Sequence, residues 1–153
     1  ANLSAYDGKK SEIKLNEEHN IFGFIDGKVE SKVTIMHLDV DNLTSRGETA
    51  SPYEISSLMF KLYAKMSEFF LTKKALSFFM GGDNFMVVAN SNHRESAEEF
   101  IDIIKNELGI ELNCGIGTGK TARNAVKLAT KSLDTIREIR DSGKEKPEIY
   151  ELT

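Results

Sequence analysis

Apolar residues recur at every third or fourth position in three long stretches of the chain, and this spacing predicts three amphipathic helices. The helices are expected over residues 51–70, 92–109 and 122–141. Core packing explains the apolar stripe of the first helix, so no cofactor is needed to account for it. The positions expected to face inward are Ile55, Leu58, Met59, Leu62, Met66, Phe69 and Phe70 in the first helix, Phe100, Ile101, Ile104 and Leu108 in the second, and Ala125, Leu128, Ala129, Leu133, Ile136 and Ile139 in the third.

The residues that begin two of these helices have capping chemistry. Ser51 is a suitable N-cap, Pro52 suits the first helical position, and Glu54 completes a capping box. Asn92 and Glu95 predict a second capping box. Both helices are therefore expected to start where the sequence offers side-chain partners for their first N–H groups.

Shorter apolar runs between turn residues predict five strands, at about 31–38, in the two arms of a hairpin within 75–90, at 110–116 and at 147–152. The order of strands and helices, β-α-β-β-α-β-α-β, predicts an α+β fold. Its first six elements are those of a ferredoxin-like βαββαβ unit, an antiparallel sheet with helices on one face, to which a C-terminal helix and a short strand are added. In that topology the first strand lies centrally, beside the hairpin.

Residues 31–153 are expected to form one domain, and residues 1–30 an irregular lead-in. The chain does not begin with Met, and the lead-in is interpreted either as a tail or as the end of a missing N-terminal half.

Composition narrows the functional classes. The 153 residues carry a net charge of −4, so the chain lacks the basic surface that nucleic-acid binding needs. No apolar run is long enough to span a membrane, and no signal peptide is recognisable. Cys114 is the single cysteine, which fits a reducing compartment and a cytoplasmic protein. Nucleotide binding, if present, is expected to be local and metal-assisted.

Acidic side chains stand at the ends of predicted strands. Asp39 and Asp41 end the first strand, and Asp83 lies at the tip of the hairpin, after Gly81 and Gly82, which permit a tight turn. Two carboxylates close together repel each other unless a cation lies between them. Mg²⁺ accepts such oxygen ligands together with phosphate oxygens, so the sequence predicts a site for one or two Mg²⁺ ions and a nucleotide triphosphate.

The predicted ligands of the metal are Asp39, Asp83 and the backbone carbonyl of Val40, and the two aspartates are the predicted catalytic residues. Ions there would polarise the α-phosphate and stabilise the leaving group. Lys120 or Arg137 is expected to neutralise the outer phosphates.

The glycine-rich stretch at 115–121 resembles a phosphate-binding loop, but the residue five positions before the Gly119-Lys120 pair is Cys114 instead of the glycine that the Walker motif requires. It is interpreted as a strand-to-helix turn whose N–H groups and Lys120 face an anion, with a solvated lysine as the alternative.

Two other metal sites are excluded. A calcium loop starting at Asp39 fails because Leu43, Thr44 and Ala50 occupy its key positions, and the three histidines show no zinc spacing. His37 alternates along a core strand and is interpreted as a structural histidine rather than a base.

Four motifs together resemble one known group of proteins. They are the strand end Leu38-Asp-Val-Asp-Asn42, the hairpin Gly81-Gly-Asp-Asn84, the stretch Gly115-Ile-Gly-Thr-Gly119 and a final helix carrying Arg137. This combination is similar to the palm-like GGDEF superfamily of nucleotidyl cyclases, and most similar to the archaeal GTP cyclohydrolase III family. The likeness covers roughly residues 33–141.

The resemblance implies a Mg²⁺-dependent hydrolase that opens the guanine ring of GTP to 2-amino-5-formylamino-6-(5-phosphoribosylamino)pyrimidin-4(3H)-one and releases phosphate. It also implies a homo-oligomer or a partner half, because that family has two related halves. The implied metal ligands are Asp39, Val40 and Asp83, and the implied substrate-binding residues are Asn42, Gly81, Gly82, Asn84, Lys120 and Arg137.

Two alternatives remain open from the sequence. One is a diguanylate-type cyclase, although Asn84 replaces the usual Glu of that motif and Gly47 stands about where cyclases place an Asn that reads guanine. The other is a palm-like domain that binds a nucleotide without turning it over.

Overall fold

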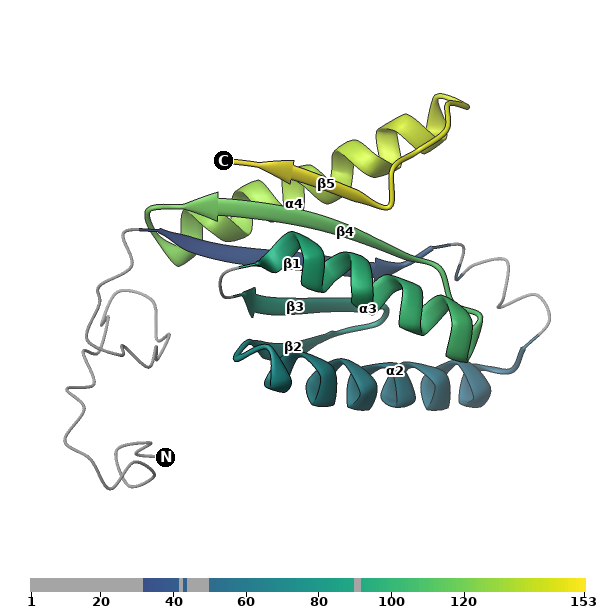
Figure 1. Ribbon diagram of the computed structural model, residues 1–153. Helices are drawn as coiled ribbons and strands as arrows, with labels where there is room; N and C mark the ends of the chain where they lie inside the picture. Colours follow the sequence, from purple (N-terminus) through teal and green to yellow (C-terminus); the bar gives the residue numbers. More distant parts are fainter. Residues whose placement is uncertain (1–31, 42, 44–49, 90–91) are drawn as a thin grey trace, which may run out of the picture.

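The computed structural model describes residues 32–41, 43, 50–89 and 92–153 (Figure 1). The predicted lead-in at 1–30 lies outside this part of the chain. The strands are β1 (Val33–Val40), β2 (Leu76–Gly81), β3 (Asn84–Ala89), β4 (Leu112–Gly119) and β5 (Ile149–Leu152), and the helices are α2 (Pro52–Thr72), α3 (His93–Leu108) and α4 (Ala122–Asp141).

The strands form one sheet in the order β2-β3-β1-β4-β5. Strand β1 is central and antiparallel to both β3 and β4, and β2 pairs antiparallel with β3. This is the predicted ferredoxin-like βαββαβ unit, and the predicted hairpin is present. Strand β5 adds to the sheet beside β4 in the parallel direction, so the complete sheet is mixed.

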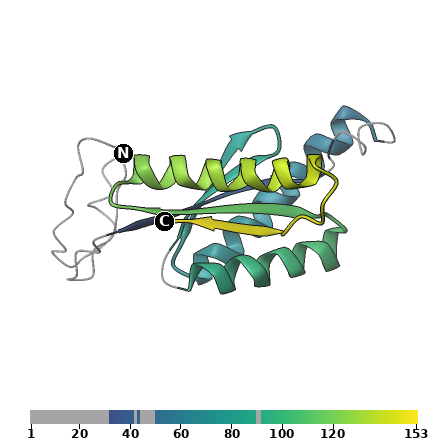
Figure 2. The same cartoon turned by 90° about the horizontal axis from the view of Figure 1, so that it is seen from above.

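Helices cover both faces of the sheet (Figure 2). Helices α2 and α3 pack on one face, where Met36, Leu38 and Val40 of β1 enter the larger core. Helix α4 covers the opposite face, where Ile35 packs against Ala125 and other small residues. Alternate residues of β1 therefore pack into the two different core layers, because successive side chains of a strand point to opposite faces. The prediction of helices on one face is confirmed for α2 and α3; the sequence assigned no face to α4.

The two predicted capping boxes have different outcomes. At α2 the Ser51 hydroxyl accepts a hydrogen bond from the backbone N–H of Glu54, and the Glu54 carboxylate accepts one from the backbone N–H of Ser51. At α3 the N-cap Asn92 has a left-handed backbone, with φ of 60°, and its side chain makes no capping bond. The second capping box is therefore wrong, since an Asn in this conformation does not aim its side chain at the helix N–H groups.

We expect Ser51→Ala to lower the free energy of unfolding by about 1 kcal/mol, because the N–H of Glu54 then loses its partner. Urea unfolding measures the change. Ser57→Ala, at an exposed position inside the same helix, is the matched control and should be neutral or slightly stabilising. Equal losses in both variants would contradict the role of the cap.

The glycines of the predicted phosphate-binding turn lie inside strand β4. A Cβ atom at Gly115 or Gly117 would overlap the backbone of α4, at Ala129 and Leu133 or at Ala125 and Ala129. These glycines let α4 lie directly on β4. The prediction that these glycines form a turn is therefore wrong, because they lie inside the strand and serve its contact with the helix.

None of the helices within the described ranges combines the length and apolar character that crossing a membrane requires.

Candidate functional site

The end of β1, the tip of the β2–β3 hairpin, the start of β4 and the end of α4 meet at one edge of the sheet (Figure 1). The pairing register fixes this arrangement. Asp39 is the cross-strand partner of Asn84 in β3 and of Asn113 in β4. Residues far apart in the sequence are therefore neighbours around the carboxylate of Asp39.

Asp39 is 5% exposed, and both of its oxygens accept hydrogen bonds. Arg137 of α4 donates to Oδ2 from Nη2 at 2.6 Å and from Nε at 3.1 Å. Asn113 donates to Oδ1 from Nδ2 at 2.9 Å. Although burial opposes its charge, Asp39 raises the pKa of the Arg137 guanidinium above its ordinary value. The carboxylate is thus held in one orientation on the α4 side of the sheet.

A second buried acid, Asp41, extends this network. Its carboxylate pairs with Lys146 at 3.1 Å and with Arg140 at 3.2 Å. Lys146 also donates to Asn113 Oδ1 at 2.6 Å, which links the surroundings of the two acids. Burial raises the pKa of Asp41, but the hydrogen bond and charge of Lys146, together with hydrogen bonds from Arg140 and Asn113, hold the pKa below its ordinary value. Asp41 is therefore an ionised structural partner of these cations.

The hairpin brings Asp83 to the same edge. Asp83 Oδ1 accepts a hydrogen bond from Asn84 Nδ2 at 2.9 Å, and Asn84 Oδ1 lies 3.2 Å from His37 Nε2. The other ring nitrogen, His37 Nδ1, lies 3.2 Å from the Thr130 hydroxyl of α4. Since Asn84 faces α4 and holds Asp83, the Asp83 carboxylate is drawn toward the face that carries Asp39.

His37 is fixed in place rather than free in solvent. Its contact with an amide oxygen favours the tautomer with hydrogen on Nε2, and Nδ1 then accepts from Thr130. Burial lowers the pKa of His37 and outweighs the opposing effect of Asn84. These contacts agree with a structural histidine that orients Asn84.

The donor set at this edge suits a metal ion only in part. No group of three or more His, Cys, Asp or Glu side chains among the described residues could hold a metal by itself. Mg²⁺ is commonly bound through one or two carboxylates, with the remaining positions filled by water and substrate phosphates. The pair Asp39 and Asp83 fits that pattern, and does not fit a metal held by protein alone.

The turn beside Asp83 leaves room for a ligand. Gly81 and Gly82 have φ of 103° and 62°, both glycines are exposed, and a Cβ at Gly81 would meet nothing within 4 Å. Their positive φ values are those that the predicted tight turn requires.

Lys120 is not brought to this edge. Gly119, the residue before it, pairs with Val33 at the start of β1, whereas Asn113 pairs with Asp39 six residues further on. At about 3.3 Å per residue, the two ends are roughly 20 Å apart. The interpretation that Lys120 and Asp39 serve one site within this chain is therefore wrong, because β4 runs antiparallel to β1.

Asn42 lies outside the described residues. Val40 follows Asp39 at the strand end, and its side chain is buried in the core under α2 and α3.

The structure adds three residues that the sequence interpretation missed, namely Asn113, Arg140 and Lys146. The signal for Asn113 was a polar residue between Leu112 and Cys114, inside an otherwise buried strand. The two cations offered no local signal, since their partner Asp41 is about a hundred residues away in the chain.

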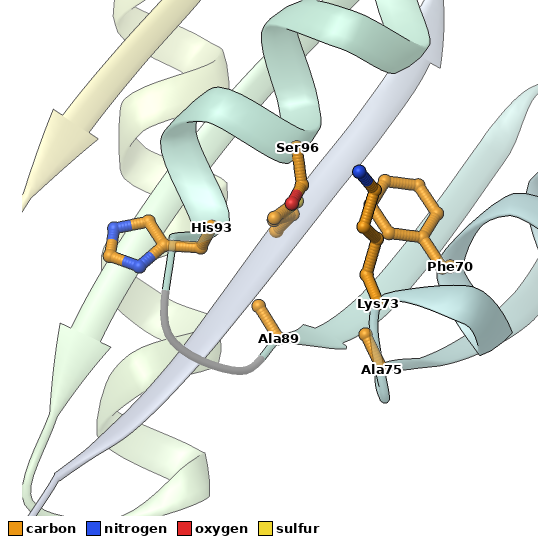
Figure 3. Close-up of a pocket in the computed structure, with 7 residues that line it drawn as sticks. Phe70, Lys73, Ala75, Ala89, His93 and Ser96 are labelled. Carbon is orange, nitrogen blue, oxygen red and sulfur yellow. The ribbon is translucent and has the colours of Figure 1, made fainter.

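A pocket elsewhere in the molecule is separate from this site (Figure 3). It lies between the end of α2 and the start of α3, where Phe70, Lys73, His93 and Ser96 line it. It opens on the α2–α3 side of the sheet, and none of the described residues that line it is acidic. It therefore offers no carboxylate ligand for a metal.

The fold formed by the sheet, the hairpin and the flanking helices is similar to that of GGDEF and cyclase domains. The structure is similar to the coiled coil and GGDEF domain of DgcB from Caulobacter crescentus, with a TM-score of 0.61 and 12% identity over 80% of this chain and 70% of that one. A bacterial light-regulated adenylyl cyclase gives a TM-score of 0.58 and 13% identity over 71% and 72% of the two chains. Identities this low show the fold alone.

Sequence similarity identifies the family to which this chain belongs. The model of the GTP cyclohydrolase III family matches residues 4–148, and the chain belongs to this family. It is 39% identical to the GTP cyclohydrolase III of Methanocaldococcus jannaschii over 71% of this chain, and 35% identical to that of Methanococcus maripaludis over 78% of this chain. These matches cover 41% and 44% of the relatives, so the chain spans a little under half of their length.

Proposed function

We propose that this domain takes part in the hydrolytic opening of the guanine ring of GTP to 2-amino-5-formylamino-6-(5-phosphoribosylamino)pyrimidin-4(3H)-one, with release of phosphate, in the cytoplasm. Membership of the GTP cyclohydrolase III family supports the reaction class. The single structural observation that carries the proposal is the carboxylate of Asp39, held beside the hairpin that bears Asp83.

In this proposal Asp39, Asp83 and the carbonyl of Val40 hold Mg²⁺, as one or two ions. When bound, Mg²⁺ supplies charge neutralisation and polarises the phosphate oxygens. Asn113 fixes the plane of the Asp39 carboxylate through Oδ1, and Asn84 orients Asp83. Gly81 and Gly82 let the nucleotide approach the backbone, and Arg137 contacts its phosphates. Lys120 has no part in this site.

We propose that the domain works within a larger assembly, either with a second copy of itself or with the remaining half of a longer protein. The curated relatives are about twice as long as the matched region. Strand β2 lies at the edge of the sheet, and its Leu76, Phe78 and Met80 are 45%, 46% and 56% exposed. An edge strand with such side chains and no charged residue favours a covering partner.

Incubation of the purified chain with GTP and Mg²⁺, followed by chromatography and a phosphate assay, tests the proposal. We expect the formylaminopyrimidine product and free phosphate, and neither product after Mg²⁺ is chelated. Recovery of GTP alone, from the chain and from an assembly that includes the rest of the longer protein, would contradict it.

The same assay separates the alternatives. A nucleotidyl cyclase, a class of protein that shares this fold, would release pyrophosphate and form a cyclic or linked guanine nucleotide. A domain that only binds would show a GTP-dependent rise in Tm without any product.

A further inference from the structure

The pairing of Arg137 with Asp39 takes up one oxygen of the carboxylate that the proposed metal site would use. Arg137 donates two N–H groups to Asp39 Oδ2, and Asn113 donates to Oδ1. A carboxylate oxygen has two lone pairs, so Oδ2 is saturated by the guanidinium. The remaining acceptor capacity of this carboxylate lies on Oδ1.

A divalent ion and a guanidinium are poor neighbours at one carboxylate oxygen. A metal bound to either oxygen of this carboxylate would stand only a few Å from the positive charge of Arg137, in a partly buried place where screening is weak. Its arrival therefore favours departure of the guanidinium from Asp39.

Arg137 keeps a second hydrogen-bond partner if its guanidinium leaves Asp39. Its side chain is 37% exposed, whereas that of Asp39 is 7% exposed, so the arginine is the mobile member of the pair. It also donates to Asp134 Oδ1 at 3.1 Å, one turn earlier on α4. This second bond lets the guanidinium leave Asp39 and keep a partner at the surface, facing the site.

We propose that Arg137 is an exchangeable counter-ion, which neutralises Asp39 in the free protein and moves to the phosphates of the nucleotide when a metal ion takes its place. This inference rests on the proposed function of the site. It predicts that metal and nucleotide bind cooperatively, because metal alone displaces Arg137 from Asp39 and gives it no anion in return. By linkage, the nucleotide strengthens metal binding by the same factor as the metal strengthens nucleotide binding.

The proposal makes opposite predictions for two affinities. Arg137→Gln removes the competing cation, so Mn²⁺ without nucleotide should bind more tightly. The same change removes a phosphate partner, so the β,γ-imido analogue of GTP with Mn²⁺ should bind more weakly. We expect each change to be roughly 5- to 150-fold, the usual range for coupling between two ligands. An arginine with only a structural role would weaken both affinities.

Calorimetric titration, supported by the electron paramagnetic resonance of free Mn²⁺, measures both affinities in the wild-type chain and its variants. Arg140→Gln is the matched control, because Arg140 lies one turn later on α4 and pairs with Asp41 instead of Asp39. It removes the same charge and should shift neither affinity by more than about twofold. Thermal unfolding checks that each variant is folded.

Arg137→Lys keeps the charge with a single nitrogen at its end and decides the question if the glutamine variant does not fold. This variant should also bind Mn²⁺ alone more tightly and the GTP analogue with Mn²⁺ more weakly, but both changes should be smaller than in Arg137→Gln. Equal or weaker Mn²⁺ binding in the Arg137 variants, while the wild type binds Mn²⁺ with nucleotide, would overturn the counter-ion role alone. Failure of the wild type to bind Mn²⁺ under either condition would overturn the proposed metal site as well.

Discussion

Asp39→Asn should weaken Mg²⁺-dependent binding of GTP by more than about 100-fold, since loss of even an outer-shell partner of a metal typically costs 10- to 100-fold. The variant keeps the size of the side chain but loses its charge. It also leaves Arg137 and Asn113 facing a group that no longer carries two anionic acceptors. Product formation should fall at least as far as binding.

Titration of GTP with and without Mg²⁺ measures this effect. Asp41→Asn is a suitable control, because Asp41 is equally buried and also paired with cations, but lies outside the proposed ligand set. Both variants should lose stability, since each breaks a buried ion pair. Only Asp39→Asn should lose metal-dependent binding. Equal losses of binding in the two variants would show that stability, and not ligation, explains the effect.

Gly117→Ala should have the largest effect on folding, with a loss of about 3 kcal/mol or more in the free energy of unfolding. The added methyl group would overlap backbone atoms of Ala125 and Ala129, and a helix backbone cannot move aside by changing a rotamer. Helix α4 would have to move away from β4. This movement would also break the ion pair between Arg137 and Asp39.

Thermal unfolding should show a fall in Tm on the order of 10 °C, or no cooperative transition at all. Gly119→Ala is the graded comparison, because its new methyl group would lie 2.9 Å from Ala125 N, a milder overlap than the 2.2 Å between a Cβ at Gly117 and Ala129 N. We expect a smaller loss there. A Gly117→Ala variant as stable as the wild type would contradict the close contact of α4 with β4.

The sequence was sufficient to predict the elements that local chemistry determines. Ser51, Pro52 and Glu54 identified the start of α2, and the paired glycines identified the hairpin. The order of these elements predicts that the first strand lies beside the hairpin, and the structure pairs Asp39 of that strand with Asn84. The expectation that Asp39 and Asp83 approach one another therefore used no knowledge of distant contacts.

The glycines of β4 were misinterpreted, although their spacing in the sequence indicates a strand. A run of alternating glycines fits a phosphate-binding turn as well as a strand under a helix. The spacing of Gly115, Gly117 and Gly119 has a period of two, which places all three on one face of a strand and favours the second interpretation. Once they are counted as strand, Lys120 moves to the far end of the sheet.

The network around Asp39 depends on contacts between distant parts of the chain. Arg137 is 98 residues from Asp39, and Asn113 is 74 residues away. No period or local motif pairs such residues, because the closing of the sheet and the packing of α4 bring them together. A polar residue inside a buried strand, such as Asn113, is the one sequence signal that indicated a partner in this region.

Anomalous diffraction from a crystal grown with Mn²⁺ and the β,γ-imido analogue of GTP tests the central claim most directly. The proposed site predicts a metal peak about 2.0–2.3 Å from a carboxylate oxygen of Asp39 and from one of Asp83, with phosphate oxygens completing the coordination. A metal–nucleotide complex bound elsewhere, with Arg137 still paired to Asp39, would contradict it.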